Sequence, residues 1–500
     1  MSLNVPGDEE SPMVAEAGQI NPVRLSPAGN PLVPAVTYDP LDPLNWGSFQ
    51  KCACIFIACF AYFTMTYSVT VPVPSFTELQ AQFDTTYTKV TWTFAVPGLG
   101  LAIGPLITSS LAETYGRRIV LIVCTAIAVL ASGCTSLKGA SLSSYMVLRF
   151  FQGLGAGPLA NICLTIINDV SFEHERGFRV GLWAMTANIG TVLGPILGGF
   201  LASVSAYWIG YHVTMLFAFL LICECFFLPE THYPRAVMLE REAHIRIGKD
   251  KSSDDPYGLK RTKQLGYLHC RSIPGVRHPK WWDAILIFCQ LWTYPTISIS
   301  VCAFVAFQYW WICSIMAMEP LAYKTQSMHV QGLLFIGLIV GLVFGELLVS
   351  GRLSDWLVAQ LARRNHDQRV PEMRLWLGYP AAIVASVGLA LWGVSVDRNW
   401  HWMTGQAAFF LYAAGTQVGN TVLSTYIVDN YPEYAMEVTM FYAVLINLAG
   451  FINPWFISVW VERSGWTWTF SAQALICSFG LIPTYALLHH YGHRMRKNLH

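Results

Sequence analysis

Stretches of apolar residues recur along the whole chain, separated by short polar segments. Twelve such stretches cover 52–72, 90–112, 119–137, 142–168, 180–202, 207–228, 284–311, 328–350, 375–396, 402–428, 437–461 and 466–488. An α-helix needs about 20 mostly apolar residues to cross about 30 Å of hydrocarbon. Backbone groups in lipid must also bond internally, which favours helices over open strands. The pattern therefore predicts an all-α membrane protein with twelve transmembrane helices.

One long polar interruption, at 229–283, separates six of these stretches from the other six. The two sets also share short motifs at equivalent places. Leu111-Ala-Glu113 follows the second stretch as Leu353-Ser-Asp355 follows the eighth, and Asp169 ends the fourth as Asp429 ends the tenth. Duplicated halves around a central site are a transporter design. We predict two pseudo-symmetric six-helix halves, a cytosolic loop between them and two cytosolic tails, the first one disordered: 1–50 (tail), 51–228 (first half), 229–283 (loop), 284–488 (second half) and 489–500 (tail).

The charge distribution predicts how the helices are oriented. Only 12% of the residues are charged and the net charge is +1, which gives no bulk attraction to nucleic acid. With both termini in the cytosol, 25 of the 31 Lys and Arg residues lie on the cytosolic side and five lie outside. This asymmetry follows the positive-inside rule. We expect a multi-pass protein of the plasma membrane with both termini cytosolic.

The loop after the second stretch reads Ser109-Ser-Leu-Ala-Glu113-Thr-Tyr-Gly116-Arg117-Arg118. Gly116 permits a sharp turn. The carboxylate of Glu113 can lie against a helix N-terminus or an arginine. The alternative is a plain basic cytosolic loop.

A charge lies inside the fourth stretch, in Arg149-Phe-Phe-Gln152-Gly-Leu-Gly-Ala-Gly157. Arg149 is about 10 Å from the predicted outer boundary at about 1.5 Å per residue. A charge at that depth is unfavourable unless it faces water or a partner. Two interpretations remain: a functional charge, or an arginine tied to carbonyl groups of neighbouring helices.

The fifth stretch contains Gly190-Thr-Val-Leu-Gly194-Pro195-Ile-Leu-Gly198-Gly199. Glycines at this spacing form a flat helix face for close packing, and Pro195 can bend the helix. We expect a conformational rather than a chemical role.

Together these three segments resemble signatures of the major facilitator superfamily. The loop motif departs from the family pattern at Ser109 and Thr114, where glycine and a basic residue are usual. The resemblance implies a latch between the halves, which we assign to Glu113, Gly116, Arg117, Arg118 and Asp355. It links Arg149 with proton transfer, and the pattern from Gly190 to Gly199 is typical of the antiporter branches. Shorter motifs, Asp42-Pro-Leu-Asn-Trp46 and Leu228-Pro-Glu-Thr231 among them, resemble fungal drug:proton antiporters.

By analogy with that family, the first, fourth, seventh and tenth helices line the substrate cavity. The candidate lining residues are polar or aromatic: Tyr67, Asn161, Gln308, Tyr309, Gln417 and Asn420. Such a mixture suits an amphipathic organic molecule, although amides also join helices. We expect Trp310 and Trp311 in the aromatic belt at the membrane interface. Asp169 and Glu224 are candidate coupling residues beside Arg149, and no carboxylate is expected at mid-membrane depth.

We therefore expect a secondary active transporter, driven by the proton gradient, that exports a small amphipathic organic compound such as a drug or a secondary metabolite. The alternative is an importer or facilitator of a small solute, such as a polyamine, on the same fold. The histidines do not cluster as in metal-dependent membrane enzymes, and no Gly-x-x-x-x-Gly-Lys-Ser/Thr phosphate loop is present. We expect no enzyme activity, metal site, cofactor or nucleic-acid partner. The expected partners are the small-molecule substrate, protons and the lipid bilayer, and the expected state is a monomer.

Overall fold

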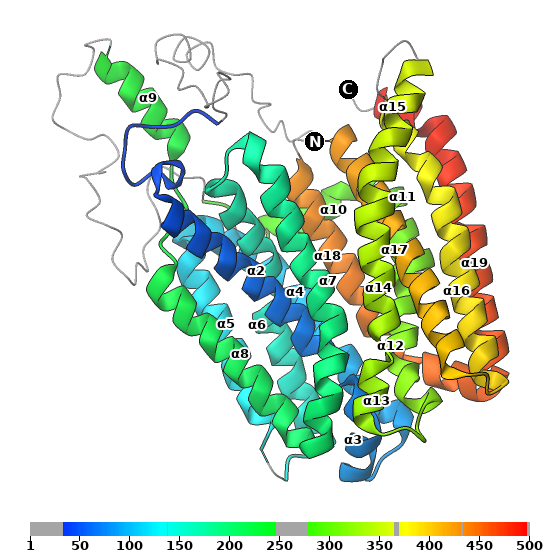
Figure 1. Ribbon diagram of the computed structural model, residues 1–500. Helices are drawn as coiled ribbons and strands as arrows, with labels where there is room; N and C mark the ends of the chain where they lie inside the picture. Colours follow the sequence, from blue (N-terminus) through cyan, green and yellow to red (C-terminus); the bar gives the residue numbers. More distant parts are fainter. Residues whose placement is uncertain (1–33, 138, 247–277, 365–369, 432–433, 498–500) are drawn as a thin grey trace.

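A computed structural model describes residues 34–137, 139–246, 278–364, 370–431 and 434–497. The described chain is almost entirely helical, with the helices arranged in two side-by-side bundles (Figure 1). The N-terminal half comprises α2 (Ser48–Thr70), α3 (Phe76–Gln82), α4 (Tyr87–Tyr115), α5 (Arg117–Thr135), α6 (Leu142–Asp169), α7 (Glu173–Val204) and α8 (Ala206–Phe227). This is the predicted six-span unit, because α3 only extends the first span.

The C-terminal half follows α9 (Arg235–Arg246), which lies in the central loop. Its helices are α10 (Asp283–Leu291), α11 (Pro295–Phe304), α12 (Trp310–Ala322), α13 (Met328–Leu333), α14 (Ile336–Phe344), α15 (Ser354–Arg364), α16 (Gly378–Asp397), α17 (Trp402–Asn430), α18 (Ala435–Ile452) and α19 (Ile457–Lys497). Short π-helical segments, Val305–Tyr309 and Gly345–Leu353, join α11 to α12 and α14 to α15.

Eleven of the described helical segments are long and apolar enough to cross a membrane. The remaining span is α17, which is 29 residues long, as α4 is, and packs along α16 and α14. It is less apolar because it carries amides and hydroxyls such as Gln406, Gln417 and Asn420. The twelve-span, two-half prediction is confirmed.

The seventh span differs from its predicted range of 284–311. The chain turns at Thr293 and Tyr294, and Pro295 begins a new helix that continues to Ala322. The apolar run Asp283–Leu291 forms the separate helix α10 against α18 and α4. The seventh span therefore begins about eleven residues later in the chain than predicted.

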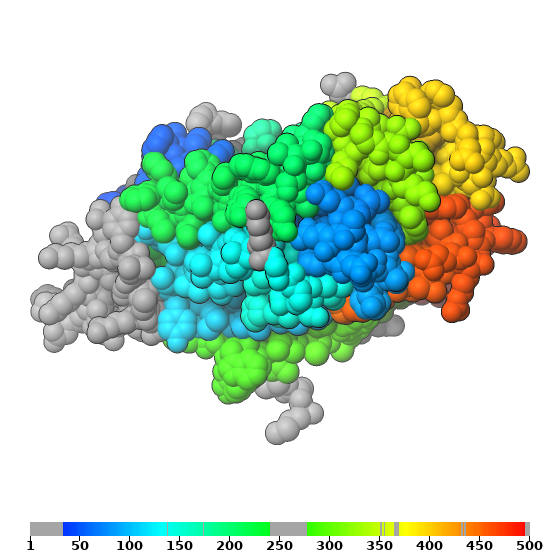
Figure 2. All heavy atoms as spheres, turned by 90° about the horizontal axis from the view of Figure 1, so that it is seen from below, coloured from blue at the N-terminus to red at the C-terminus, as the bar shows by residue number. Residues whose placement is uncertain are grey.

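The two ends of the bundle are distinct. One end, here the α9 face, carries α9, the start of α2 and the end of α19; the opposite end, the α3 face, carries α3 and α13 (Figure 1). Viewed from the α3 face, the segment around α3 fills the space between the two halves (Figure 2). The buried core of the C-terminal half extends here into the N-terminal half through Val73, Phe76, Leu79, Tyr87, Val90 and Phe94.

Polar contacts also close the α3 face. The Tyr87 hydroxyl donates to the Ala317 carbonyl at 2.7 Å, and the Thr91 hydroxyl donates to the Pro454 carbonyl at 3.1 Å. The Ser458 hydroxyl lies 3.2 Å from that of Thr88. We call these contacts the α3-face gate. In this structure the gate is shut. Access to the space between the two halves is therefore closed at the α3 face.

The N-terminal tail is ordered earlier than the predicted boundary at residue 50. Asp42 is fully buried, accepts hydrogen bonds from Thr37 and forms an ion pair with Arg235 at 3.0 Å. The Tyr233 hydroxyl adds a 3.0 Å hydrogen bond to the Asp39 carboxylate. The segment from residue 34 is thus fastened to the chain just after α8, while predictions for 1–33 fall outside the described residues.

Candidate functional site

A cavity lies between the two halves, next to the middle of the seventh span. The space between its lining residues is about 600 Å³, with open solvent included. The lining residues come from both halves: Met65, Thr66, Val69, Thr70, Phe94, Gly98, Leu101, Thr191, Tyr309, Ile312, Cys313, Met316, Ile446, Asn447 and Gly450. None of these side chains is charged. A mostly apolar wall with a few hydroxyls and one amide is suited to a small molecule with an apolar body.

Of the predicted cavity residues, Tyr309 lines this space. Tyr67 does not, because its ring is buried inside the N-terminal half against His212, with 5.7 Å between ring centroids. Asn161 lies on α6, and neither its amide nitrogen nor its amide oxygen has a hydrogen-bond partner. These three residues therefore occupy three separate environments.

The predicted amides of the C-terminal half join helices. Gln308 donates to the Gly415 carbonyl at 3.0 Å and is fully buried. Gln417 donates to the Glu346 carboxylate at 2.9 Å, and Asn420 accepts from the Tyr442 hydroxyl. These bonds satisfy polar groups within the bundle, which was the alternative interpretation.

Trp310 and Trp311 are not at the membrane interface. Both lie near the middle of the span Pro295–Ala322, and Trp311 is only 5% exposed. Its indole nitrogen donates to the Phe307 carbonyl at 3.0 Å. The expectation of an aromatic belt was wrong because the seventh span starts later than the apolar pattern indicated.

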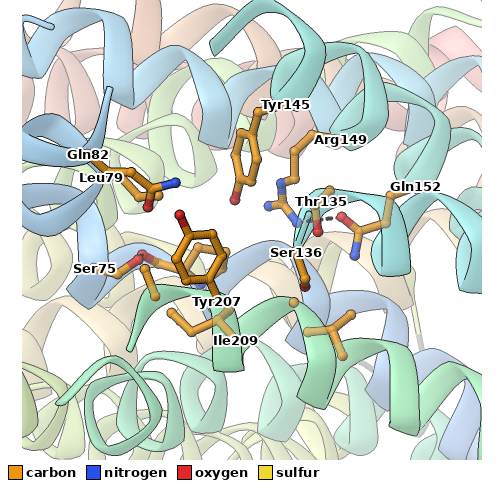
Figure 3. A pocket seen from close by; sticks show the side chains of 14 residues that line it. Ser75, Leu79, Gln82, Thr135, Ser136, Tyr145, Arg149, Gln152, Tyr207 and Ile209 are labelled. Carbon is orange, nitrogen blue, oxygen red and sulfur yellow. Dashed lines mark hydrogen bonds between the residues drawn. The ribbon is translucent and has the colours of Figure 1, made fainter. Parts of the chain in front are cut away.

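Arg149 is bonded to the backbone of the first span. Its guanidinium donates to the carbonyls of Ser68 at 2.9 Å and Val69 at 3.2 Å. It also donates to the Gln152 side chain at 2.6 Å, as Figure 3 shows. The Ser68 carbonyl would normally accept from the amide four residues later, but that residue is Pro72, which has no N–H. Arg149 therefore replaces the missing backbone donor.

The surroundings of Arg149 form a small polar pocket within the N-terminal half, towards the α3 face. Figure 3 shows the phenol rings of Tyr145 and Tyr207, the amide of Gln82 and the guanidinium around the same space. None of the lining side chains is acidic. The arginine thus meets dipoles rather than a counter-ion.

The two acids predicted to act with Arg149 lie elsewhere. Asp169 forms an ion pair with Arg117 at the α9 face. Glu224 is fully buried in the N-terminal half, where one carboxylate oxygen accepts from Thr125 at 2.9 Å and the other has no partner. The structure does not bring these three predicted coupling residues together.

Two further acids lie within the C-terminal half. Glu346 accepts from Gln417 and from the Thr421 hydroxyl, both at 2.9 Å, close to the middle of α17. Glu319 is fully buried in the last turn of α12, and neither of its oxygens has a hydrogen-bond partner. Glu346 lies four residues before the end of the span Met328–Ser350, and the expectation of no carboxylate at mid-membrane depth stays a prediction. Glu319 was missed because it lies beyond the predicted end of the seventh span.

The loop motif forms a compact cluster of charges at the α9 face. Gly116 has φ = 102° between α4 and α5, a conformation that non-glycine residues rarely adopt. Arg117 pairs with Asp169 at the end of α6, and Arg118 donates to the Cys225 carbonyl at 2.6 Å. Glu113 is in electrostatic contact with Arg117. These residues join helices within one half.

Glu230, which sequence analysis did not single out by itself, completes this cluster. Its two carboxylate oxygens accept from the backbone amides of Arg117 at 3.0 Å and Arg118 at 3.1 Å. A carboxylate here caps the first turn of α5 and favours the positive end of the helix dipole. The only earlier signal was its place in the motif Leu228–Thr231.

Beside this cluster lies His232. Burial, and secondarily the charge of Arg117, lowers the pKa of His232 to about 4. Asp355, the predicted counterpart in the C-terminal half, is the second residue of α15, and its side chain lies outside the described part of the structure.

The glycines of the fifth span face two different helices. An added Cβ at Gly190 would lie 2.3 Å from the Thr66 hydroxyl, and one at Gly198 would lie 2.0 Å from the Val71 carbonyl. Gly194 similarly faces Thr70 of the first span. Gly199 instead faces α13, where its Cβ would lie 2.5 Å from the Met328 carbonyl.

The glycines of this motif therefore allow the fifth span to pack closely against the first span. At the α3 face, Gly199 also allows close packing between the two halves. Gly332 of α13 packs against α7 near Gly199, because a Cβ on Gly332 would lie 2.6 Å from the Pro195 carbonyl. Pro195 is within α7, which continues as a helix through it.

Comparison with known proteins agrees with this architecture. The family model described as the Major Facilitator Superfamily matches residues 58–454. The chain is 27% identical over 470 residues to the MFS-type transporter atr4 of Stereocaulon alpinum, covering 92% of this chain and 81% of that protein. It is 25% identical over 472 residues to the efflux pump radE of Floropilus chiversii, covering 92% and 84%.

A solved structure shares the fold. The xylose transporter XylE from E. coli, in a partially occluded inward-open conformation, superposes with a TM-score of 0.60 at 15% identity, over 89% of this chain and 98% of that one. The chain belongs to the major facilitator superfamily. It is a multi-pass membrane transporter, with spans that pack around a central cavity.

Proposed function

We propose that this transporter exports a small, uncharged or weakly charged amphipathic compound, driven by the proton gradient across the plasma membrane. The observation that carries the proposal is the uncharged wall of the central cavity. A desolvated ammonium or carboxylate is unfavourable unless a partner compensates it. A mainly apolar substrate needs no such partner.

The same wall argues against the alternative of a polyamine carrier. Several ammonium groups would require carboxylates within reach, and no carboxylate is among the residues that line this cavity. A sugar would need many donors and acceptors. The hydroxyls of Thr66 and Thr70 donate to carbonyls of their own helix, and the Asn447 amide donates to the Ala443 carbonyl at 2.8 Å. The Tyr309 hydroxyl is then the polar group of the wall with most freedom.

The direction of transport is supported by resemblance and by the named relatives, of which radE is called an efflux pump. The α9 face is the cytosolic face in this proposal, since it carries the basic segments. Protease access to tags at each terminus in sealed vesicles tests the orientation. A tag digested from the outside of intact cells would overturn it.

Transport itself is tested in inside-out vesicles with an imposed pH gradient and a panel of apolar, cationic and sugar compounds. We expect accumulation of apolar compounds that stops when the gradient is collapsed. Tyr309→Ala should weaken accumulation by about tenfold, equivalent to about 1.4 kcal/mol of binding. Trp468→Ala, at an exposed ring of α19, is the matched control and should leave it unchanged. Accumulation that survives collapse of the gradient would instead indicate a facilitator.

A further inference from the structure

Glu319 is the acid for which the architecture offers no structural explanation. It lies in the last turn of α12, one residue before Pro320, at the shut α3-face gate. The side chain is 0% exposed, and neither oxygen accepts a hydrogen bond from any residue that the structure describes. The neighbouring gate contact, from Tyr87 to the carbonyl of Ala317, is made two residues earlier on the same helix.

The groups that face Glu319 are neutral. The titratable side chains in electrostatic contact with it are the phenols of Tyr87 from α4 and Tyr323 from the end of its own helix. Glu78 on α3 is turned to the backbone amide of Ala206. The other charged side chains on this face are exposed, and none forms an ion pair with Glu319 among the described residues: Asp84, Lys89, Lys324, Asp397, Arg398, Glu462 and Arg463.

A carboxylate in this place would be a buried charge with neither a cation nor a donor. Burying an unpaired charge is strongly unfavourable, whereas burying a neutral carboxyl is much less so. When the halves separate at the α3 face, water can reach the carboxyl and the ionised form becomes favourable. The shut and open gates therefore differ in their preference for the proton.

We propose that Glu319 is a proton-binding site that controls the α3-face gate. Closing the gate takes one proton from the solution at that face onto the Glu319 carboxylate, and opening returns it. The inference rests on the proposed function only in taking the α3 face as the outer side. In an exporter, an acidic exterior then promotes closure after the substrate has left, which returns the carrier to the state that loads from the cytosol.

The gate can be followed without substrate through Ser458→Cys. Ser458 is 1% exposed and bonded to Thr88 when the gate is shut, so a cysteine there reacts with a hydrophilic maleimide only when the gate opens. The rate is measured in lipid nanodiscs at pH 7.5 and pH 5.5. It is divided by the rate for Thr86→Cys, an exposed position, to remove the pH dependence of the thiol itself. The parent chain without either change gives the background from native cysteines.

With Glu319 intact, we expect the normalised rate to fall by up to about tenfold per pH unit, as one proton allows. Glu319→Gln and Glu319→Met remove the ionised form, so the rate should be low at both pH values. Glu462→Gln, an exposed acid of the same face, should keep the pH dependence. Gel filtration selects the folded variants, and the apolar Met variant serves if the Gln variant does not fold.

Two results would overturn the proposal: a normalised rate that does not change with pH in the Glu319 protein, or a pH dependence that persists in a folded neutral variant. Neither result depends on a substrate or on the direction of transport. The gate proposal and the export proposal can therefore fail separately.

Discussion

The first and fifth spans of each half form equivalent helix pairs, yet the two pairs pack differently. In the N-terminal half, α2 and α7 touch through Gly190, Gly194 and Gly198, with no space for a Cβ. In the C-terminal half, α12 and α18 meet near Gly450, whose added Cβ would contact only the Cys313 sulfur at 3.9 Å. Both of these residues line the central cavity.

The buried charged groups of the two halves also have different partners. The N-terminal half holds Arg149 on backbone carbonyls, where it remains ionised because guanidinium does not lose its proton, and it holds Glu224 against the Thr125 hydroxyl. In the C-terminal half, Glu346 accepts hydrogen bonds from two side chains, whereas Glu319 accepts none from the described residues. The comparison indicates a half whose first and fifth spans pack closely beside a half in which the equivalent pair of spans leaves space.

The strongest test of this contrast is leucine at the two glycine sites. Gly194→Leu should prevent folding or lower the stability by at least about 3 kcal/mol, because the added atoms meet Thr70 and the Val71 backbone. Gly450→Leu should leave a folded protein and block transport by filling the cavity. Thermal unfolding monitored by gel filtration measures the first effect and vesicle transport the second. Gly181→Leu, with nothing within 4 Å of its Cβ, is the control in α7. Similar stability of the Gly194 and Gly450 variants would remove the contrast.

The next effect concerns Arg149. Arg149→Ala leaves two carbonyls, of Ser68 and Val69, without their donor, at about 1–3 kcal/mol for each unsatisfied group. We expect a lower melting temperature together with loss of transport, and partial recovery in Arg149→Lys, whose ammonium can donate to carbonyls but lacks the planar fork of the guanidinium. An Arg149→Ala protein that melts normally but exports without proton dependence would favour the coupling role over the structural one.

We expect a smaller difference in the stability that is lost when each of two ion pairs at the α9 face is broken. Arg117–Asp169 is the more buried pair, with side chains 13% and 22% exposed, against 27% and 38% for Arg374–Asp429. Asp169→Asn should cost about 1–2 kcal/mol and slow transport, as should Arg117→Ala. Asp429→Asn should cost at most about 0.5 kcal/mol and be screened by salt. Equal effects in 0.5 M salt would show that burial does not distinguish the halves.

The smallest expected effect is a pH dependence of folding stability, which arises from His232 at the α9 face of the N-terminal half. Since the pKa of His232 is lowered to about 4 in the folded protein, the unfolded chain binds more protons between about pH 6.5 and pH 4. Stability should therefore fall as the pH drops through this window, by up to about 1.4 kcal/mol per pH unit. His232→Gln should flatten that part of the curve in chemical unfolding experiments at pH 7, 6 and 5. An unchanged curve would mean that His232 is protonated without cost.

Sequence patterns predicted the fold because lipid imposes a minimum helix length, and that constraint applies to every span. The exception was the seventh span, where the apolar run Asp283–Leu291 reads like the start of a span but forms α10. That error moved Trp310 and Trp311 to an interface and hid Glu319. The candidate site was predicted less well, because an amide on a span can face a cavity or a neighbouring helix. Nothing in the sequence distinguishes Tyr309, which lines the cavity, from Gln308, which joins two helices.

The contact between Arg149 and the first span has a consequence for how related sequences should differ. Pro72 creates the carbonyl without a donor, and Arg149 supplies the donor from another helix. Either residue alone is unfavourable: the proline leaves a carbonyl unsatisfied, and the arginine leaves a charge without dipoles. The two positions should therefore be inherited as a pair. Among relatives that carry a different residue at the equivalent of Pro72, we expect the arginine to be replaced as well, and an alignment of such relatives would reveal that covariation.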